Sequence, residues 1–199
     1  MNTFKKLPIY ALALATFAFA SCESESPVAE HEEELITDVT LSFTEINSSG
    51  AAIGNKFSFK ASDPQGLELG TTPTIETVNL VKGKIYKMEI ILFNTIENEN
   101  ITLEILEDAD EHQFYFLGTA FVGSPPLSIV YDDAYGELIG LTTKVTVAAS
   151  PSFNNATMRI ILRHDLNKRF AGANSPNFQN YVQAGGESDL EIDFPLVIN

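Results

Sequence analysis

Two histidines and the acidic residues beside them are the side chains of this sequence best suited to binding a metal ion. His112 lies in residues 107–117, where four carboxylates precede three consecutive aromatic residues. His164 ends another apolar run. Because alternate side chains of an extended chain share a face, each histidine should lie at the end of an apolar face, near a rim. If the two strands are neighbours, two imidazoles and a carboxylate could ligate zinc, copper or nickel.

The third ligand of such a site is expected to be Glu111, which directly precedes His112, with Asp108 and Asp110 as alternatives. A second interpretation involves no metal. Each histidine would then cap a strand end and hydrogen-bond a carboxylate or a backbone carbonyl. A separation of more than about 8 Å between the side chains of His112 and His164 would exclude a shared ion, because metal–ligand bonds are about 2 Å long.

The other acidic groups are expected to form solvated surface. The run from Glu104 to Glu111 lacks the central glycine and terminal glutamate of a calcium-binding EF-hand loop. Residues 132–133 and 187–193 are interpreted in the same way. The only basic cluster is expected to pair with acidic neighbours. Its members are Arg159, Arg163, Lys168 and Arg169.

The sequence contains no motif for nucleophilic catalysis. Gly-x-Ser-x-Gly is missing, and no glycine-rich phosphate loop follows an apolar run. Acidic residues are too numerous for any one pair to indicate a glycosidase, and the absence of tryptophan weakens a sugar-stacking interpretation. We therefore predict that the protein is not an enzyme.

Charge and composition limit the partners further. The 199 residues carry a formal net charge of -15, which argues against nucleic acid, because phosphate binding needs a positively charged surface. With 44% hydrophobic residues, the chain can bury a core of ordinary size. The single cysteine excludes an intramolecular disulfide, so its position in the chain indicates its role.

The N-terminus has the pattern of a lipoprotein signal peptide. Two lysines precede an apolar run from 7 to 20, which is too short for a standard membrane span. The run ends in small residues before Cys22, which resembles a bacterial lipobox. We expect residues 1–21 to be removed and Cys22 to carry acyl chains, palmitate among them, that anchor the protein to a membrane. The alternative is a plain secretory signal cut near Ala20 or Ser21, with Cys22 left as a free thiol.

Residues 22–34 are expected to form a disordered acidic tether, because six glutamates and no aromatic residue follow the cysteine. Acidic residues at this place resemble the export signals of Bacteroidetes-type surface lipoproteins. This resemblance implies a lipid-anchored outer-membrane protein that faces the cell exterior. A spacer that faces the periplasm is the alternative.

From residue 35 onward, apolar and polar residues alternate in many short runs, which is typical of half-buried strands. Residues 75–81 are expected to form one of these strands. The most regular run is 190–198, in which Pro195 falls on the solvent side and predicts an edge strand.

Two segments depart from this pattern. Residues 98–110 fit either a strand or a helix capped by Asn100, and their leucine, alanine and glutamate content favours the helix. Residues 166–186 are rich in glycine, asparagine and proline, which predicts a long loop with a functional or mobile role.

Many short strands joined by glycine, proline and asparagine turns, with at most one short helix, predict an all-β fold. The favoured architecture is a single β-sandwich, immunoglobulin-like or related, over residues 35–199. Two small β units divided near residues 124–126 are the alternative.

Five motifs give the mature chain a resemblance to a group of small Bacteroidetes lipoproteins. They are residues 34–44 (ELITDVTLSFT), 110–116 (DEHQFYF), 140–143 (GLTT), 161–164 (ILRH) and 185–191 (GGESDLE). The group is often described as type 1 periplasmic binding fold proteins that accompany TonB-dependent outer-membrane receptors. The resemblance implies an accessory role at the outer membrane, with His112 and His164 inside motifs of the group. A periplasmic binding fold is α/β with long helices, whereas the periodicity of this chain predicts strands, so we keep the all-β prediction.

Two functions follow as hypotheses. The first is a non-enzymatic envelope lipoprotein that captures a ligand, such as a transition-metal ion, beside a TonB-dependent uptake receptor. The second is a structural or adhesive surface module whose β-sandwich binds a partner protein through its loops.

Overall fold

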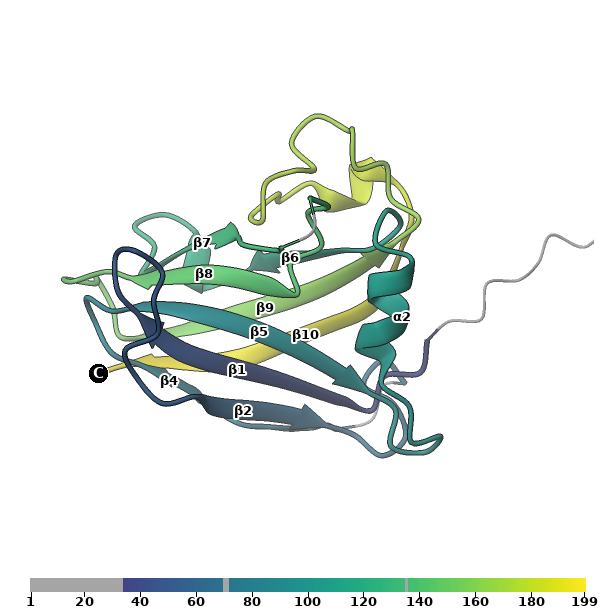
Figure 1. Ribbon diagram of the computed structural model, residues 1–199, viewed down its shortest axis with the longest axis horizontal. Helices are drawn as coiled ribbons and strands as arrows, with labels where there is room; N and C mark the ends of the chain where they lie inside the picture. The colour runs from purple at the N-terminus through teal and green to yellow at the C-terminus, as the bar shows by residue number, and fades with distance from the viewer. Residues whose placement is uncertain (1–33, 70–71, 135) are drawn as a thin grey trace, which may run out of the picture. The chain divides into compact units, whose positions relative to one another are not determined.

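Two packed β-sheets build the part of the chain that the computed structural model describes, residues 34–69, 72–134 and 136–199 (Figure 1). This part contains ten strands, the short helix α2 (Ile101–Glu107) and two 3-10 turns, η1 (Thr119–Phe121) and η2 (Tyr181–Ala184). The predicted all-β sandwich with at most one short helix is confirmed. None of the helices described has the length and hydropathy needed to span a bilayer.

The larger sheet has six antiparallel strands in the order β3-β2-β1-β5-β8-β7. They are β1 (Asp38–Ile46), β2 (Phe57–Ser62), β3 (Thr74–Ile75), β5 (Ile85–Phe93), β7 (Leu127–Tyr131) and β8 (Thr142–Val147). Its register places Leu41 between Phe59 and Ile90, so one face of the sheet is apolar. The opposite face carries ion pairs, such as Lys56 with Glu89 at 2.6 Å.

The smaller sheet has four strands in the order β4-β10-β9-β6, in which only the β4–β10 pair is parallel. They are β4 (Val78–Leu80), β6 (Gln113–Leu117), β9 (Asn155–His164) and β10 (Glu187–Ile198). Both sheets combine strands from before and after residues 124–126, and the described residues form one compact unit.

The inner faces of the two sheets share one apolar core. Removing each large side chain from water stabilises the fold by about 1.5–3 kcal/mol. The larger sheet contributes Leu41, Phe43 and Met88 to this core, and the smaller sheet contributes Phe114, Phe116 and Phe194, all fully buried.

Helix α2 lies at one end of the sandwich (Figure 1). Ile101 and Ile105 are buried in the core, and the hydroxyl of Thr102 accepts from the N–H of Leu92 at 2.8 Å. Of the two predictions for residues 98–110, the helix is therefore correct. Asn100 stands at its N-cap position, but its side chain does not make the predicted capping hydrogen bond.

Residues 166–186 cover the outer face of β6 and β9 with a second, smaller apolar cluster. The ring of Tyr115 lies 6.2 Å from that of Phe178 and 6.0 Å from that of Tyr181. The hydroxyl of Tyr115 donates to the carbonyl of Ala173 at 3.0 Å. The predicted long loop is thus irregular apart from η2, yet it is packed. Its buried cluster consists of Tyr115, Leu117, Ile161, Leu166, Ala173 and Ala184.

Irregular chain also covers the outer edge of β6, the last strand of its sheet. Four backbone groups of β6 that no strand pairs are hydrogen-bonded to loops and side chains. These bonds, donor first, are Phe114 N to Ile139 O (2.6 Å), Phe116 N to Pro176 O (2.7 Å), Tyr131 Oη to Phe114 O (2.7 Å) and Asn177 Nδ2 to Phe116 O (2.6 Å).

Two strand predictions are wrong in detail. Residues 75–81 form parts of β3 and β4, because the chain passes from one sheet to the other at Glu76 and Thr77. Pro195 does not mark an edge, since β10 lies between β4 and β9. Pairing with β4 begins only at Leu196, so the missing N–H of the proline costs no bond to that strand.

One acidic residue that was predicted to be solvated has a structural role. Asp133 accepts three backbone N–H groups, from Ile139 at 3.2 Å, Gly140 at 2.7 Å and Thr142 at 2.9 Å. The carboxylate therefore closes the loop that leads into β8.

The expected signal peptide, the acylation site Cys22 and most of the expected tether lie outside the described residues. Glu34, predicted as the last residue of a disordered tether, is described and is held against the domain, with 15% of its side chain exposed. The next residues fix it there. Ile36 is buried, and the N–H of Thr37 donates to the carbonyl of Phe93 at 3.1 Å.

Candidate functional site

The two histidines predicted from the sequence stack against each other at one end of the smaller sheet. His164 is the last residue of β9, and His112 immediately precedes β6, which pairs with β9. The ring centroids are 4.4 Å apart, and the ring planes differ by 20°. The separation is well below the value of about 8 Å that would exclude a shared ion.

His112 is almost fully buried, with 1% of its surface exposed. Its Nδ1 lies 3.1 Å from the carbonyl oxygen of Asp108, and because a carbonyl can only accept, Nδ1 carries the proton. Nε2 therefore presents a lone pair, and it has no hydrogen-bond partner among the described residues. A bond from one ring nitrogen to a carbonyl is also the arrangement that orients many metal-binding imidazoles.

Two carboxylates face this lone pair from beyond hydrogen-bond distance. Oδ2 of Asp189 is 3.8 Å from Nε2 of His112, and Oε1 of Glu34 is 3.9 Å from it. With bonds of about 2.0–2.1 Å, two ligands of one metal ion lie about 3.4 Å apart in a tetrahedron and about 4.1 Å apart in a line. The distances from Nε2 to the two carboxylates therefore match the separation of two ligands that bind one ion.

The imidazole of His164 lies close enough to bind the same ion as His112, but one of the two rings must change its orientation. One ligand atom each of His112, His164 and Asp189 lie within 4.8 Å of one another. Stacked rings direct their lone pairs side by side, so one ring has to rotate before both can bind the same ion. Burial and Asp108 hold His112 in place, whereas 19% of the His164 side chain is exposed, so a shared ion would require His164 to turn away from Glu111.

Asp189 was not predicted, because residues 187–193 were expected to be solvated. It is in fact buried, with 8% exposure, and so is its neighbour Leu190. The pairing of β10 with β9 shifts register between Ser188 and Leu190, and such a bulge interrupts the alternation of inward and outward side chains. No signal in the sequence marks this bulge, so a strict period of two places Asp189 wrongly.

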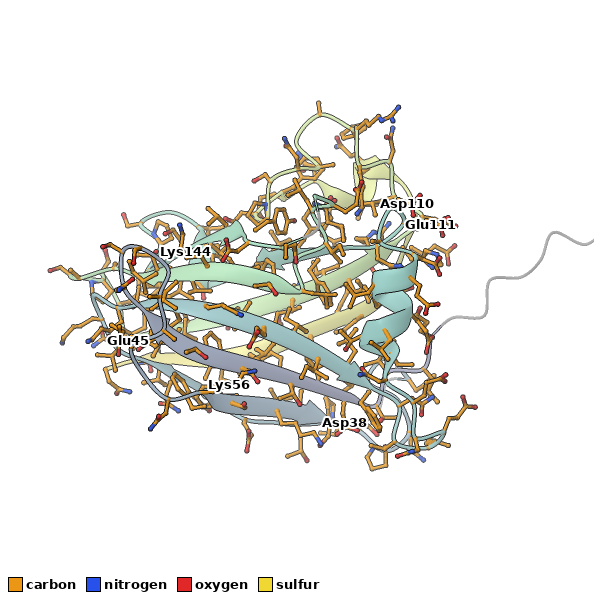
Figure 2. The ribbon with its side chains drawn as sticks, in the orientation of Figure 1. Asp38, Glu45, Lys56, Asp110, Glu111 and Lys144 are labelled. Atoms are coloured by element: carbon orange, nitrogen blue, oxygen red, sulfur yellow. The ribbon has the colours of Figure 1, made fainter. Side chains whose placement is uncertain are left out.

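Glu111, the predicted third ligand, contacts His164 instead of His112. Its Oε2 is 3.4 Å from Nε2 of His164, and Oδ1 of Asp165 is 3.9 Å from the same nitrogen. These three residues also bring ligand atoms within 4.8 Å of one another. Figure 2 shows Glu111 beside Asp110, past the end of α2, and 42% of the Glu111 side chain is exposed. The structure thus places Glu111 on the solvent side of His164 and Asp189 on the buried side.

Electrostatics favour a cation at this place. The pKa of Glu34 is raised to about 8, by burial first and then by four nearby carboxylates. Burial also lowers the pKa of His112. At neutral pH without a metal, the site therefore holds a protonated Glu34 and a neutral His112, and a divalent ion would offset the repulsion among the carboxylates. The four carboxylates are Asp189, Glu104, Asp108 and Glu99.

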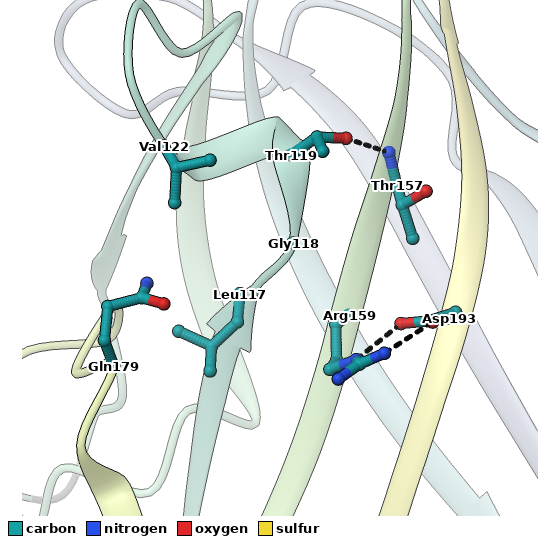
Figure 3. Close-up of a pocket in the computed structure, with 8 residues that line it drawn as sticks. All are labelled: Leu117, Gly118, Thr119, Val122, Thr157, Arg159, Gln179 and Asp193. Atoms are coloured by element: carbon teal, nitrogen blue, oxygen red, sulfur yellow. Dashed lines mark hydrogen bonds and ion pairs between the residues drawn. The ribbon is translucent and has the colours of Figure 1, made fainter.

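Two other depressions on the described surface are weaker candidates for a metal-binding site, because neither is lined by a histidine. A depression of about 400 Å³ next to η1 contains Arg159, whose guanidinium is held by Asp193 through bonds of 2.7 and 2.8 Å (Figure 3). Another lies beside α2 and is lined by Glu97, Glu99, Glu104 and Glu107. Glu107 is exposed, as predicted for a solvated acidic surface.

Comparisons of the chain with protein-family models, with curated proteins and with solved structures found no match. The function is therefore inferred from the chemistry of this site. Two imidazoles and a buried carboxylate can bind a borderline-soft divalent ion, and the arrangement contains no nucleophile paired with a base.

Proposed function

We propose that this protein is a non-enzymatic lipoprotein of the cell envelope that binds a divalent transition-metal ion through His112, His164 and Asp189. The main support is the buried Nε2 of His112, which has no hydrogen-bond partner among the described residues and lies 3.8 Å from Asp189. Mixed imidazole and carboxylate ligands suit zinc, copper and nickel, whereas calcium and magnesium sites use oxygen ligands.

The cellular part of the proposal rests on the sequence. The lipobox-like segment before Cys22 supports a lipid anchor, and the resemblance to small Bacteroidetes lipoproteins supports an accessory role beside a TonB-dependent receptor. A net charge of -15 also draws cations towards the surface. The protein would then hold a metal ion at the outer membrane for uptake.

Zinc titration tests the metal site. We expect the purified full chain, kept in detergent, to bind one zinc ion with a Kd of about 10 μM or tighter by calorimetry. His112→Gln and Asp189→Asn should each weaken binding by at least about tenfold, because each removes one ligand. Asp193→Asn is the matched control, since it changes an exposed aspartate on the same strand and should leave the Kd unchanged.

Binding no tighter than about 1 mM would refute the metal site and favour the alternative, a structural or adhesive module. Equal losses in Asp189→Asn and Asp193→Asn would also count against it, because general charge would then explain the affinity. Comparing zinc binding by His164→Ala and by Glu111→Gln shows whether the ion lies on the Asp189 side or on the Glu111 side of His164. We expect a loss in His164→Ala and little change in Glu111→Gln.

Membrane fractionation tests the anchor. Replacing Cys22 with serine should move the protein from the membrane fraction to the soluble fraction, because serine cannot be acylated at this place and the acyl chains supply most of the membrane affinity. Retention of the Cys22→Ser protein in the membrane fraction would contradict acylation at Cys22.

A further inference from the structure

Glu34 has the geometry of an additional ligand in the same site. It lies just before β1, four residues from the first paired residue of the strand, and its Oε1 is 3.9 Å from Nε2 of His112. Its other oxygen, Oε2, is buried and has no hydrogen-bond partner among the described residues. Both oxygens are thus directed inward, although a glutamate at this position could extend into solvent.

The surroundings of Glu34 lack a cation that would explain its burial. Within the described ranges, its only ion-pair contact is the imidazole of His112. Its other charged neighbours are carboxylates, with Asp189 the strongest influence. A buried carboxyl without hydrogen bonds is costly even when it is protonated, and a cation between Glu34 and His112 would remove that cost.

We propose that Glu34 is the fourth ligand of the metal ion, so that two imidazoles and two carboxylates from four separate chain segments enclose it. This inference rests on the proposed metal site. The four segments are the residues before β1, the turn between α2 and β6, the end of β9 and the bulge in β10. Once the Glu34 carboxylate closes on the group formed by His112, His164 and Asp189, four nitrogen and oxygen ligands would complete the tetrahedral shell that zinc prefers in closed sites.

Binding of the ion would then make the N-terminal end of the domain, residues 34–37, more firmly held. Ile36 and Thr37 are already fixed by the core and by Phe93. Binding of Glu34 to the ion would add a second point of attachment at the residue where the segment from Cys22 reaches the domain. The loaded and metal-free proteins would therefore differ in how firmly residues 34–37 are held.

Calorimetry and hydrogen exchange together test this inference on the full chain in detergent. Glu34→Gln keeps the size of the side chain but cannot ionise to bind a cation, and we expect it to weaken zinc binding by about 10–100-fold. Glu97→Gln is the control, because it removes an exposed glutamate of the nearby acidic surface, and it should leave the affinity unchanged. Zinc should slow amide exchange in a peptide that covers residues 34–37 of the unmodified protein, but not in Glu34→Gln.

The outcomes separate the two proposals. If the unmodified protein binds zinc, and Glu34→Gln binds it equally well with the same exchange behaviour, Glu34 is not a ligand and only the further inference is overturned. If the unmodified protein binds no zinc, both proposals fail. Equal weakening in Glu34→Gln and Glu97→Gln would also overturn the inference, because the effect would then come from overall charge.

Discussion

Replacing Gly186 with alanine is expected to lower the free energy of unfolding by about 3 kcal/mol or more. Gly186 has a φ of +71°, and a Cβ at this position would overlap the carbonyl oxygen of His164. The clash involves backbone on both sides, so no side chain can move aside. The left-handed backbone adds about 1–2 kcal/mol for a residue with a Cβ.

The neighbouring glycine provides a matched control. Gly185 also has a positive φ, +83°, but a Cβ at this position would meet nothing within 4 Å. Gly185→Ala should therefore cost only the conformational part, about 1–3 kcal/mol at its φ of +83° and ψ of −166°, and less than Gly186→Ala. Chemical denaturation of both variants measures the difference. Equal losses would show that the close approach of Gly186 to His164 does not contribute to stability.

Replacing Arg163 with methionine is expected to cost about 2–4 kcal/mol of folding free energy, because the guanidinium makes several buried charge-assisted bonds. It donates to the hydroxyl of Ser188 at 2.8 Å and to the carbonyl of Gly185 at 2.8 Å, and it also bonds the carbonyl of Gly186. Its central carbon lies 5.5 Å from the ring centroid of Tyr181. The side chain thus joins β9 to the start of β10 and to η2.

Arg159, on the same strand, is the control for this change. It pairs with Asp193 at 2.7 Å, but 47% of its side chain is exposed. Exposed ion pairs contribute little, so Arg159→Met should cost less than about 1 kcal/mol. Thermal and denaturant unfolding of the two variants would show the contrast. A larger loss in Arg159→Met would mean that the buried bonds of Arg163 are not what holds the segment after β9.

The sequence predicts the layers of the fold well because alternation and turn residues are local signals. The burial of Ile101 and Ile105 follows from their helical spacing in the same way. Features that depend on tertiary contacts cannot be predicted from these local signals of the sequence. A strict period of two cannot show the crossing between sheets at Glu76 and Thr77, and it assigns Pro195 to an edge although a partner strand begins at the next residue.

The candidate site shows the same division. Strand phase placed His112 and His164 at the ends of apolar faces, and the pairing of β6 with β9 brings them together. The carboxylates could not be chosen by the same logic. The sequence predicts Glu111 as the third ligand, but Glu111 contacts His164 on its solvent side. Asp189 faces the buried side through a bulge, and Glu34 belongs to the segment before β1.

The covered edge of β6 has a consequence for self-association. A terminal strand with free N–H and C=O groups can accept a strand from another molecule, and many proteins prevent this with charged side chains or with very short strands. Here the groups of Phe114 and Phe116 are already bonded to Ile139, Pro176 and two side chains. A nick within residues 166–186 would free the N–H and C=O groups of Phe116, which are bonded to Pro176 and Asn177. Proteolysis at that segment should therefore lead to aggregation before it leads to global unfolding.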